Sequence, residues 1–501
     1  MVATTHTAAL LRIAAANHPD RDAYVHNDKR ATYAWLDRVA DGFAATLIGL
    51  GVQPGDVVAL MLPSSIKFAA CYLGALRAGA ITSAINGRLG ENEQRSILDR
   101  TTPAVTVVGD GATPPDGAPI GHVIGVEDLK DAFGGTPTAA FPDIAMSDAA
   151  CIVWTSGTTG IPKGAVYDHA RMRAISDNIG QLTEPGDRRL VVLPFPHVGY
   201  MTRMWDELAN GTTVVIASEP WSAAETLRLI RDEHITMGTG VPTQWELVLS
   251  HPDIAITDFS GLRVVGTGGA TIAPDLIRRM RETLRCPVIT RYTSTEAGVT
   301  TSTLVGDPDD VIATTVGRPA PDVELRILSI DDDGGDVHAR TGEVGEILSR
   351  SPAMMREYWR DPVTTAATID ADGWLHTGDL GVIGDDGNLR IVGRLKEMYI
   401  RGGYNVYPSE VEATLGTHPD VAQVAVIGMP EPVLGEIGVA FVVATDVQHP
   451  PDLTTLRDWC RSRIADYKAP DTLITVEALP LNATNKVDKI SLATTYASTR
   501  A

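Results

Sequence analysis

The stretch from Thr155 to Gly164, with the sequence TSGTTGIPKG, combines the residue types that bind phosphate groups. Small side chains let backbone N–H groups approach phosphate oxygens closely, hydroxyl groups can donate hydrogen bonds, and Lys163 adds a positive charge. The apolar run CIVW (151–154) before it predicts a buried strand that leads into a loop. A Walker loop would need Ser or Thr after the lysine, whereas Gly164 follows here. We therefore expect a phosphate-binding loop of another type, with a flexible Ser/Gly loop as the alternative.

Further motifs follow in order along the chain: PFPH, GTGGA, YTSTE, GWLHTGD, GRLKE and NATNK. With the loop, this ordered set resembles the adenylate-forming superfamily, specifically the acyl-CoA synthetases, over nearly the whole chain. The resemblance implies a ligase that joins a small carboxylic acid to AMP, releases pyrophosphate and transfers the acyl group to the thiol of CoA. It also implies ATP, Mg²⁺ and CoA, because cationic groups must neutralise the phosphates before a carboxylate can approach them.

The resemblance assigns the phosphate, metal and nucleotide contacts to specific residues. The expected phosphate-binding residues are Thr155, Ser156, Gly157, Thr158, Thr159, Gly160 and Lys163. Glu296 would hold Mg²⁺, and Thr295 would bond the α-phosphate. The expected AMP-binding residues are Gly268, Gly269, Ala270, Arg291, Tyr292, Thr293, Thr295, Asp379 and Arg394. Among them Tyr292 would stack on adenine, and Asp379 would accept hydrogen bonds from the ribose, with Arg394 as its second partner.

The resemblance also implies roles in acyl transfer. Lys486 would bond the carboxylate and the α-phosphate, with Lys489 as the nearby alternative, and Lys396 would be the hinge of a rotating domain. His197 resembles a gate beside the acyl pocket, and a structural histidine is its alternative. The expected acyl-pocket residues are His197, Val198, Gly199, Gly240 and Gly266. The expected CoA-binding residues are Arg401, Gly402, Gly403 and Tyr404.

Several positions depart from the usual pattern of the family. Arg291 and Thr293 flank Tyr292 where glycine is usual, Asn485 precedes Lys486 where glycine is usual, and PFPH has a proline in place of an aromatic residue. These changes put adenylation in more doubt than thioester formation, because glycine alone combines φ > 0 with close approach to phosphate. Three alternatives stay open: an enzyme deficient in adenylation, a ligase that uses a carrier protein, and a non-catalytic acyl-adenylate-binding regulator.

The substrate class follows from what the gate region lacks and from the glycines of the pocket. No acidic residue occurs in PFPHVGYMTRMW before Asp206, so no partner for a substrate ammonium group is expected there. Small residues leave volume, which favours a long or bulky apolar acid, such as a polycyclic one, over acetate. Larger neighbours, Tyr200 and Trp245 among them, could refill that volume.

Alternating helices and strands predict how these motifs are positioned. The spacing of apolar residues predicts a helix that starts at Thr32 and stops at Gly51, a strand from Val57 to Leu62, a helix over Ile66 to Arg77 and a strand in AITSAI (80–85). The later expected strands are CIVW (151–154), LVVL (190–193), TVVIA (213–217) and LRVVG (262–266). Such alternation is typical of a parallel α/β sheet. Surface loops are expected over Gly109 to Pro142 and Asp331 to Gly335.

A second unit begins near the GRLKE motif. It contains VAQVAVIGM, the run IGVAFVV from Ile437 to Val443, and a helix whose apolar side includes Leu453 and Ile464. The fold class expected is therefore α/β, with a large N-terminal multi-sheet body and a small mobile C-terminal α+β domain. The expected boundaries are 1–393 for the body, 394–396 for the hinge and 397–501 for the cap.

The composition narrows the class of partner and the compartment. The 501 residues carry 42 basic and 63 acidic side chains, a net charge of −21, which argues against nucleic-acid binding. The four cysteines are far apart, as expected of buried thiols in a reducing compartment. The apolar stretch LLRIAAA is too short for a signal peptide, and no run could span a bilayer. We expect a cytoplasmic enzyme without an integral membrane segment, with a homodimer as one expected assembly.

Overall fold

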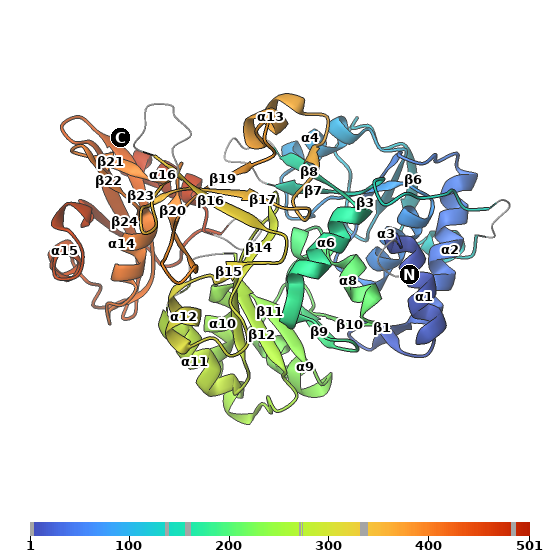
Figure 1. The fold of residues 1–501 in the computed structure, drawn as a ribbon, viewed down its shortest axis with the longest axis horizontal. Coiled ribbons are helices and arrows are strands. Elements are labelled where there is room, and N and C mark those ends of the chain that lie inside the picture. Colours follow the sequence, from blue (N-terminus) through green and yellow to red (C-terminus); the bar gives the residue numbers. More distant parts are fainter. Residues whose placement is uncertain are drawn as a thin grey trace.

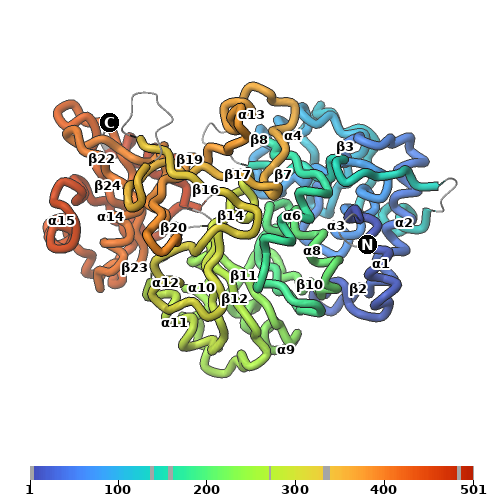
Figure 2. Tube along the Cα trace, viewed as in Figure 1, coloured from blue at the N-terminus to red at the C-terminus, as the bar shows by residue number. Residues whose placement is uncertain are grey.

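The computed structural model describes residues 5–135, 140–155, 162–269, 272, 274–330, 339–481 and 487–500. It has an elongated outline in which the blue elements from the start of the chain gather at one end and the orange and red elements of the last hundred residues at the other (Figure 1). The Cα trace shows the same division, with the N-terminus and C-terminus in opposite halves (Figure 2).

The early helices begin and end where their capping residues predict. Helix α2 (Tyr33–Gly49) starts after Thr32, whose side chain accepts a hydrogen bond from Trp35 N–H at 3.2 Å. Helix α3 (Ile66–Arg77) starts after Ser65 in the same way. The first expected helix–strand alternation is therefore confirmed nearly to the residue.

A seven-stranded sheet carries the phosphate-loop motif. Its strand order is β18 (Glu357–Tyr358), β8 (Lys163–Asp168), β7 (Ala149–Thr155), β4 (Ile81–Ala84), β3 (Val57–Met61), β5 (Val105–Val108) and β6 (His122–Gly125). Strands β3 to β7 pair in parallel, whereas β8 returns antiparallel to β7, with Thr155 and Lys163 as register partners. Thr155 and Lys163, at or near the two ends of the motif, are thus neighbours in this sheet.

A nine-stranded sheet carries the later motifs. Its order is β15 (Arg318–Pro319), β14 (Gly298–Ser302), β13 (Val288–Ser294), β12 (Val264–Gly268), β11 (Met237–Gly240), β9 (Arg188–Val191), β10 (Thr213–Ile216), β1 (Asp22–His26) and β2 (Lys29–Thr32). The central strands from β13 to β1 pair in parallel. In such sheets ligands bind at the carboxyl ends of the strands, where the GTGGA and YTSTE motifs lie.

Helices cover both large sheets. Their bounds are α1 (Thr7–Asn17), α4 (Glu91–Thr101), α5 (Leu129–Ala132), α6 (His169–Ile179), α7 (Val198–Met201), α8 (Met204–Ala209), α9 (Ala223–Asp232), α10 (Pro242–Leu249), α11 (Pro274–Leu284), α12 (Asp309–Thr314) and α13 (Pro362–Thr368). One apolar cluster joins the two sheets through α1, α2, α3, α6 and α8. A second lies on the other face of the nine-stranded sheet, beneath α9, α10 and α11.

A smaller antiparallel sheet connects the body to the C-terminal unit. Its order is β16 (Glu324–Ser329), β17 (Gly345–Arg350), β19 (Leu375–Ile383) and β20 (Leu389–Arg394). The C-terminal unit has its own sheet, formed by β22 (Tyr404–Val406), β21 (Tyr399–Arg401), β24 (Gly435–Ala444), β23 (Val421–Glu431) and β25 (Thr472–Thr475). Helices α14 (Pro408–Leu415), α15 (Leu453–Arg461) and α16 (Lys489–Arg500) pack on that sheet in two apolar clusters.

The main differences from the sequence expectations occur at short elements. The segment from Gly109 to Pro142 is not only loop, because β6 pairs with β5 at the sheet edge and α5 follows it. Helix α15 ends at Arg461, so Ile464 packs on the unit from beyond the helix. The loop expected at Asp331 to Gly335 lies outside the described residues.

The sequence predicts buried cysteines and no membrane-spanning segment. All four cysteines are buried and unpaired. Within the described part of the chain, no helix has the length and apolar character needed to cross a membrane.

Candidate active site

A buried tyrosine and a carboxylate meet where the nine-stranded sheet lies against the connecting sheet. The Tyr292 hydroxyl donates to Asp379 Oδ2 at 2.6 Å, and Arg394 Nε lies 3.2 Å from Asp379 Oδ1. Tyr292 and Asp379 are each 8% exposed. Burial and the adjacent carboxylate raise the pKa of Tyr292 well above its ordinary value, so the hydroxyl keeps its proton and remains a donor.

The backbone around Asp379 fixes this arrangement. Asp379 and Arg394 are register partners on β19 and β20, which brings the two motifs GWLHTGD and GRLKE together. The Asp379 N–H donates to Thr377 Oγ1 at 3.1 Å, and Thr377 in turn donates to the Ile347 carbonyl at 2.7 Å. A carboxylate has about four lone-pair sites, which suits Asp379 to accept hydrogen bonds from ligand hydroxyl groups.

The GTGGA motif comes close to β13, the strand that carries Tyr292. Gly268 pairs with Arg291, and a Cβ built on Gly268 would lie 2.4 Å from the Arg291 carbonyl oxygen. Gly269 adopts φ +77°, a conformation that favours glycine. The two glycines are therefore required by the backbone itself, and Ala270 lies outside the described residues.

A second polar group forms around Glu296 of the YTSTE motif. The Tyr358 hydroxyl donates to Glu296 Oε1 at 2.9 Å, and Lys163 Nζ lies 5.3 Å from the centre of the Tyr358 ring. Tyr358 is buried, and burial followed by the Glu296 charge raises its pKa above the ordinary value. The phenol therefore stays protonated and holds one oxygen of the carboxylate in place.

Strand pairing explains why these three residues meet. Strand β18 carries Tyr358 and pairs antiparallel with β8, which begins at Lys163. Glu296 is anchored from its own carbonyl, which accepts from Met355 N–H at 2.7 Å. Next to it, the Thr295 carbonyl accepts from the Tyr167 hydroxyl at 2.7 Å. Glu296, the expected metal ligand, and Lys163 thus both lie beside Tyr358, near the start of β8.

Two of the motifs that carry most of the expected chemistry lie partly or wholly outside the described residues. Residues Ser156, Gly157, Thr158, Thr159 and Gly160 of the phosphate loop lie outside the described residues, as do Asn485 and Lys486 of NATNK. The structure does describe both ends of the first motif, because Thr155 and Lys163 face each other across β7 and β8.

The expected gate segment begins with a capped helix. His197 precedes α7, and its Nδ1 accepts a hydrogen bond from Gly199 N–H at 3.1 Å. The Gly199 carbonyl accepts from Arg189 at 2.8 Å. Within the segment, the rings of Phe195 and Tyr200 stack with their centroids 3.5 Å apart. Gly199 is therefore held through both its N–H and its carbonyl.

The glycines expected to line an acyl pocket do not share one face of the sheet. A Cβ on Gly240 would lie 3.2 Å from Trp245 Nε1, so α10 fills the space beside it. A Cβ on Gly266 would lie 3.4 Å from Leu182, on the opposite face. The Trp245 indole also donates to the Gly266 carbonyl at 3.2 Å. Trp245 therefore does occupy the volume next to Gly240.

Arg291 and Thr293 flank Tyr292 on β13, but their environment differs from that of the Tyr292–Asp379 pair. Side chains alternate along a strand, and the Arg291 guanidinium points away from the Tyr292–Asp379 pair to donate to the Asn178 carbonyl at 3.2 Å. A register irregularity follows between Tyr292 and Thr293. Arg291 was expected among the AMP-binding residues, but its side chain lies on the other face of the sheet.

The expected hinge coincides with a change of sheet. Strand β20 ends at Arg394, and residues 395–398 connect it to β21 through a partly buried turn. Lys396 lies in this turn and is exposed. Lys489 is not a free surface residue, because its Nζ pairs with Glu397 at 2.7 Å and with Glu412 at 3.0 Å. Burial opposes the charge, but the two carboxylates raise the pKa of Lys489.

The expected CoA segment is a tight hairpin between β21 and β22. Gly402 and Gly403 have φ values of +57° and +87°, as a two-residue turn with both central residues left-handed requires. Tyr404 is 57% exposed and stacks on Tyr467 with centroids 4.6 Å apart. Arg401 instead faces inward and forms two bonds to Asp471, at 2.7 and 2.8 Å.

Sequence reasoning missed several residues of this site. Tyr358, Tyr467 and Asp471 were not singled out, although each contacts a predicted site residue. For Tyr358, the only sequence signal is an aromatic residue in REYWRDP downstream of YTSTE. Its contact with Glu296 spans 62 residues and depends on the β8–β18 pairing, which no local pattern shows.

Comparisons with known proteins agree with the fold and the site. The family model "AMP-binding enzyme" matches residues 11–359, and "AMP-binding enzyme C-terminal domain" matches residues 410–486. A Rhodococcus jostii relative, "3-[(3aS,4S,7aS)-7a-methyl-1,5-dioxo-octahydro-1H-inden-4-yl]propanoyl:CoA ligase", is 37% identical over 97% of this chain and 98% of its own. "Long-chain-fatty-acid--CoA ligase FadD13" from Mycobacterium tuberculosis is 33% identical over 98% of each. The solved structure of ATP-bound MatB from Rhodopseudomonas palustris has a TM-score of 0.88 and 28% identity, covering 98% of this chain and 99% of that one.

The match over most of the chain and the arrangement of the motifs define an adenylate-forming ligase. The chain belongs to the AMP-binding enzyme family. It is an acyl-CoA synthetase, an acid–thiol ligase whose substrates include ATP and CoA, as the resemblance of its motifs implied. The expected fold class, a multi-sheet α/β body with a smaller C-terminal α+β unit, is confirmed.

Proposed function

We propose that this enzyme activates a bulky, polycyclic carboxylic acid as its acyl-adenylate and transfers the acyl group to CoA, with Asp379 holding the ribose. The supporting observation is the Asp379 carboxylate itself, which is buried, bonded to Tyr292 and paired with Arg394 across β19 and β20. A buried carboxylate at the junction of the two motifs is suited to a ligand that carries neighbouring hydroxyl groups.

Glu296 is the proposed Mg²⁺ ligand. Its Oε1 is held by the Tyr358 hydroxyl, which leaves Oε2 for a cation. No group of three or more His, Cys, Asp and Glu side chains suited to a metal occurs among the described residues. That fits Mg²⁺, which commonly binds through one or two carboxylates together with substrate phosphates and water. When bound, the ion would neutralise phosphate charge.

The proposed adenylation step joins two anions. A carboxylate oxygen of the acid attacks the α-phosphorus of ATP, and the bond to pyrophosphate breaks. Lys163 and Lys486 supply positive charge, and Lys486 bonds the reacting carboxylate and the α-phosphate, which lowers their repulsion. Thr295 bonds the α-phosphate, and its carbonyl is held by Tyr167.

The proposed transfer step uses the C-terminal unit as a movable cap. Rotation about residues 394–396 would exchange the Lys486 loop for the hairpin that contains Gly402 and Gly403, within domains of 1–393 and 397–501. The CoA thiolate then attacks the acyl carbon past His197, and AMP leaves. The turn at 395–398, which connects two sheets and exposes Lys396, supports a hinge at this point.

The proposed substrate class draws on relatives and on the pocket. Two relatives, 37% and 38% identical, are named as ligases for a propanoate attached to a dioxo-octahydroindene ring system. No acidic side chain occurs in the segment from Pro194 to Trp205 to bind a substrate ammonium group. We therefore place the substrate among ring-bearing acids that lack an ammonium group rather than among amino acids.

The test is a separation of the two half-reactions. With an active acid from a panel of fatty, aryl and polycyclic acids, Lys486→Ala should lower acid-dependent pyrophosphate release by roughly 10²–10³-fold. Transfer from synthetic acyl-adenylate to CoA should largely survive. Lys29→Ala, which removes an exposed lysine, is the matched control. Equal losses in both steps would refute the role of Lys486, and no thioester with any acid would refute the function.

The same assay separates the alternatives left by the sequence. Transfer without pyrophosphate release in the unmutated protein would indicate an enzyme deficient in adenylation, and ATP binding without turnover would indicate a regulator. Replacing CoA with a phosphopantetheinylated carrier protein tests the remaining alternative. Because the Arg291 side chain points away from Asp379, it does not obstruct the ribose contact, which favours the two-step reaction.

The last part of the proposal concerns the oligomeric state of the enzyme and its compartment in the cell. We propose a cytoplasmic enzyme that forms a homodimer. Light scattering of the purified protein would give the mass of the assembly, and fractionation of cells that produce it would give the compartment.

A further inference from the structure

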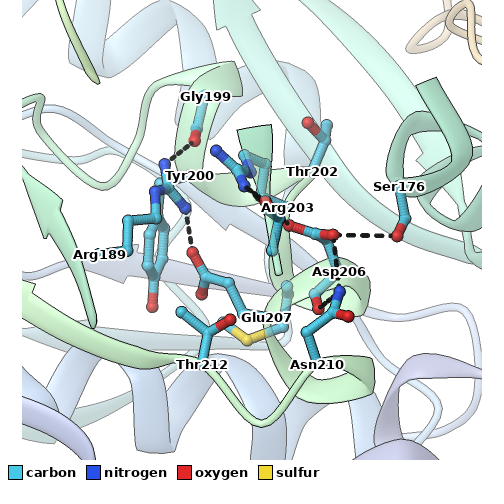
Figure 3. Close-up of polar contacts among 12 residues, drawn as sticks. Ser176, Arg189, Gly199, Tyr200, Thr202, Arg203, Asp206, Glu207, Asn210 and Thr212 are labelled. Carbon is cyan, nitrogen blue, oxygen red and sulfur yellow. Dashed lines mark hydrogen bonds and ion pairs between the residues drawn. The ribbon is translucent and has the colours of Figure 1, made fainter. Parts of the chain in front are cut away.

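Four buried charged side chains lie behind the gate segment and form two ion pairs (Figure 3). Arg189 pairs with Glu207 and donates to the Gly199 carbonyl, and Arg203 pairs with Asp206 at 2.8 Å. We call these four residues, together with Arg291, the buried charge cluster. Asp206 also accepts from Ser176 and Asn210, so its oxygens are fully engaged. Each carboxylate of the cluster thus has its own arginine.

Arg291 is the member of the cluster without an acid. It is 9% exposed, and its bond to the Asn178 carbonyl is its one hydrogen bond among the described residues. Its Nε is buried without a partner. Arg189 and Arg203 also have an unpaired Nε, but each is neutralised by a carboxylate. The cluster therefore has three guanidinium groups for two carboxylates, an excess of one buried positive charge.

Burial and the nearby Arg203 charge lower the pKa of Arg291 to about 9. The group still carries its charge at neutral pH. A buried charge without a partner costs folding free energy, so it is retained where a further contact uses it. Burial is the first cause of this shift and also lowers the pKa of Arg189, which has a carboxylate partner. Only the contacts of Arg291 therefore show that it lacks a counter-charge among the described residues.

The register of the nine-stranded sheet places Arg291 beside the expected acyl pocket. Parallel register partners share a face, so Arg291 on β13 lies on the same face as Gly268 on β12. Gly266, two residues earlier, and its partner Thr239 are also on that face. The strands next to Arg291 therefore present glycine backbone and the Thr239 side chain on this face, and Leu182 packs beside Gly266.

A structural role alone does not account for these features. Asn178 is near the C-terminus of α6, and a cation there would stabilise the helix end. That contact uses one donor of a group that has five. It also leaves the charge of the cluster unbalanced, whereas Arg189 and Arg203 are balanced in the same region. The remaining donors can bind an oxygen of a ligand.

We propose that Arg291 is a specificity-determining residue that binds an acceptor oxygen, a carboxylate or a ketone, at the end of the acyl group remote from the reacting carboxylate. The inference rests on the proposed function and narrows its substrate class to oxygenated acids. A carboxylate would accept two bonds from the guanidinium fork and balance its charge. A ketone would accept the bonds without balancing the charge.

The test compares three acids of matched shape: cyclohexylpropanoate, its ring ketone and its ring carboxylate. In the unmutated enzyme, kcat/KM should be roughly 10- to 100-fold higher for the two oxygenated acids, the range for a hydrogen bond to a charged group. The kcat/KM for the ring carboxylate should exceed that for the ring ketone if charge balance determines the preference. The two values should be equal if hydrogen bonding alone determines it.

Variants of Arg291 then test whether its side chain causes the preference for oxygenated acids. Arg291→Met should abolish or reverse the preference while KM for ATP stays unchanged, and Arg291→Lys should keep part of the preference for the ring carboxylate. A merely structural arginine would change all three acids by the same factor. If Arg291→Met does not fold, the profile of the unmutated enzyme and of Arg291→Lys decides.

Two outcomes overturn the inference while leaving the proposed function intact. One is an unmutated enzyme that uses cyclohexylpropanoate as well as or better than its oxygenated analogues. The other is an equal loss for all three acids in Arg291→Met. Absence of acid-dependent pyrophosphate release with these acids and with the wider panel would instead overturn the proposed function, and the inference with it.

Discussion

At the scale of single residues, the hydroxyl of Tyr358 connects two motifs that lie far apart in sequence. It donates to Glu296, while its ring lies beneath Lys163 of the phosphate-loop motif. Residues that orient a metal ligand commonly tune the affinity of the site. Tyr358 is thus a positioning residue, which acts through the carboxylate it holds.

Removing this hydroxyl should weaken the metal site alone. We expect Tyr358→Phe to raise the Mg²⁺ concentration for half-maximal adenylation by roughly 10-fold, the order expected for one hydrogen bond to a charged group. Mn²⁺ binding in the presence of ATP, followed by electron paramagnetic resonance, should weaken in parallel. Transfer from preformed acyl-adenylate should be unaffected.

Tyr167→Phe is the matched control, because that hydroxyl binds the Thr295 carbonyl instead of a carboxylate. Its metal dependence should stay close to that of the unmutated enzyme. A Tyr358→Phe enzyme with normal Mn²⁺ affinity, or with equal loss in both half-reactions, would contradict the assigned role.

The sequence indicated which motif residues to examine but not how they meet. Tyr292 and Asp379 were both expected near the nucleotide, yet their direct bond and the inward turn of Arg291 depend on strand register. Arg401 was expected at CoA, and its pairing with Asp471 could not be foreseen, because 70 residues separate them. Motif chemistry is local in sequence, whereas the partners come from tertiary pairing.

At the scale of elements, the link between β20 and β21 is fastened by the start of α16. Lys489 is the first residue of α16, and it pairs with Glu397 in the turn and Glu412 on α14. The Ser409 hydroxyl also donates to the Val392 carbonyl of β20. The turn is thus held by side chains from the C-terminal unit.

Loss of the Lys489 charge should loosen this attachment. Lys489→Met would leave Glu397 and Glu412 without their shared cation, and we expect a loss of about 1–3 kcal/mol in the free energy of unfolding, reduced from the buried limit because the side chain is 25% exposed. Urea unfolding measures the loss, and limited proteolysis should cut faster within 395–398. Lys29→Met, at an exposed site, should change neither.

Elements with strong local signals were predicted well, and short ones were not. Helices α2 and α3 have capping hydroxyls and continuous apolar faces, so their limits followed from the sequence. Strand β6 has four residues and one partner strand, and its neighbourhood is rich in Gly, Pro and Asp. Its pairing with β5 overrides that composition.

At the scale of the whole molecule, the first helix is fixed to the centre of the body through a buried histidine. His169 Nδ1 lies 2.9 Å from Thr7 Oγ1 and accepts from Thr7 N–H at 3.3 Å. Burial, with the nearby His6, lowers the pKa of His169 to about 3. The folded protein therefore holds this imidazole neutral throughout the range in which an unfolded chain would protonate it.

Acid should destabilise the fold through this group. Below pH 6.5 the unfolded state binds a proton that the folded state excludes until about pH 3, so stability falls as pH falls through that window. Between pH 7 and pH 5 we expect the unfolding free energy of the unmutated protein to fall by about 2 kcal/mol more than that of His169→Gln. Urea titrations at the two pH values measure the difference, and parallel losses would contradict it.

The body and the C-terminal unit have separate hydrophobic cores, and this separation affects how such ligases diversify. Both hydrophobic clusters of the C-terminal unit consist of its own residues, and among the described residues the Ser409 hydroxyl bonds the Val392 carbonyl of the body near the turn. Mutations that alter which thiol is accepted can therefore accumulate on one module while the acid selected by the other is preserved. Chimaeras joined at this turn offer a direct way to recombine the two preferences.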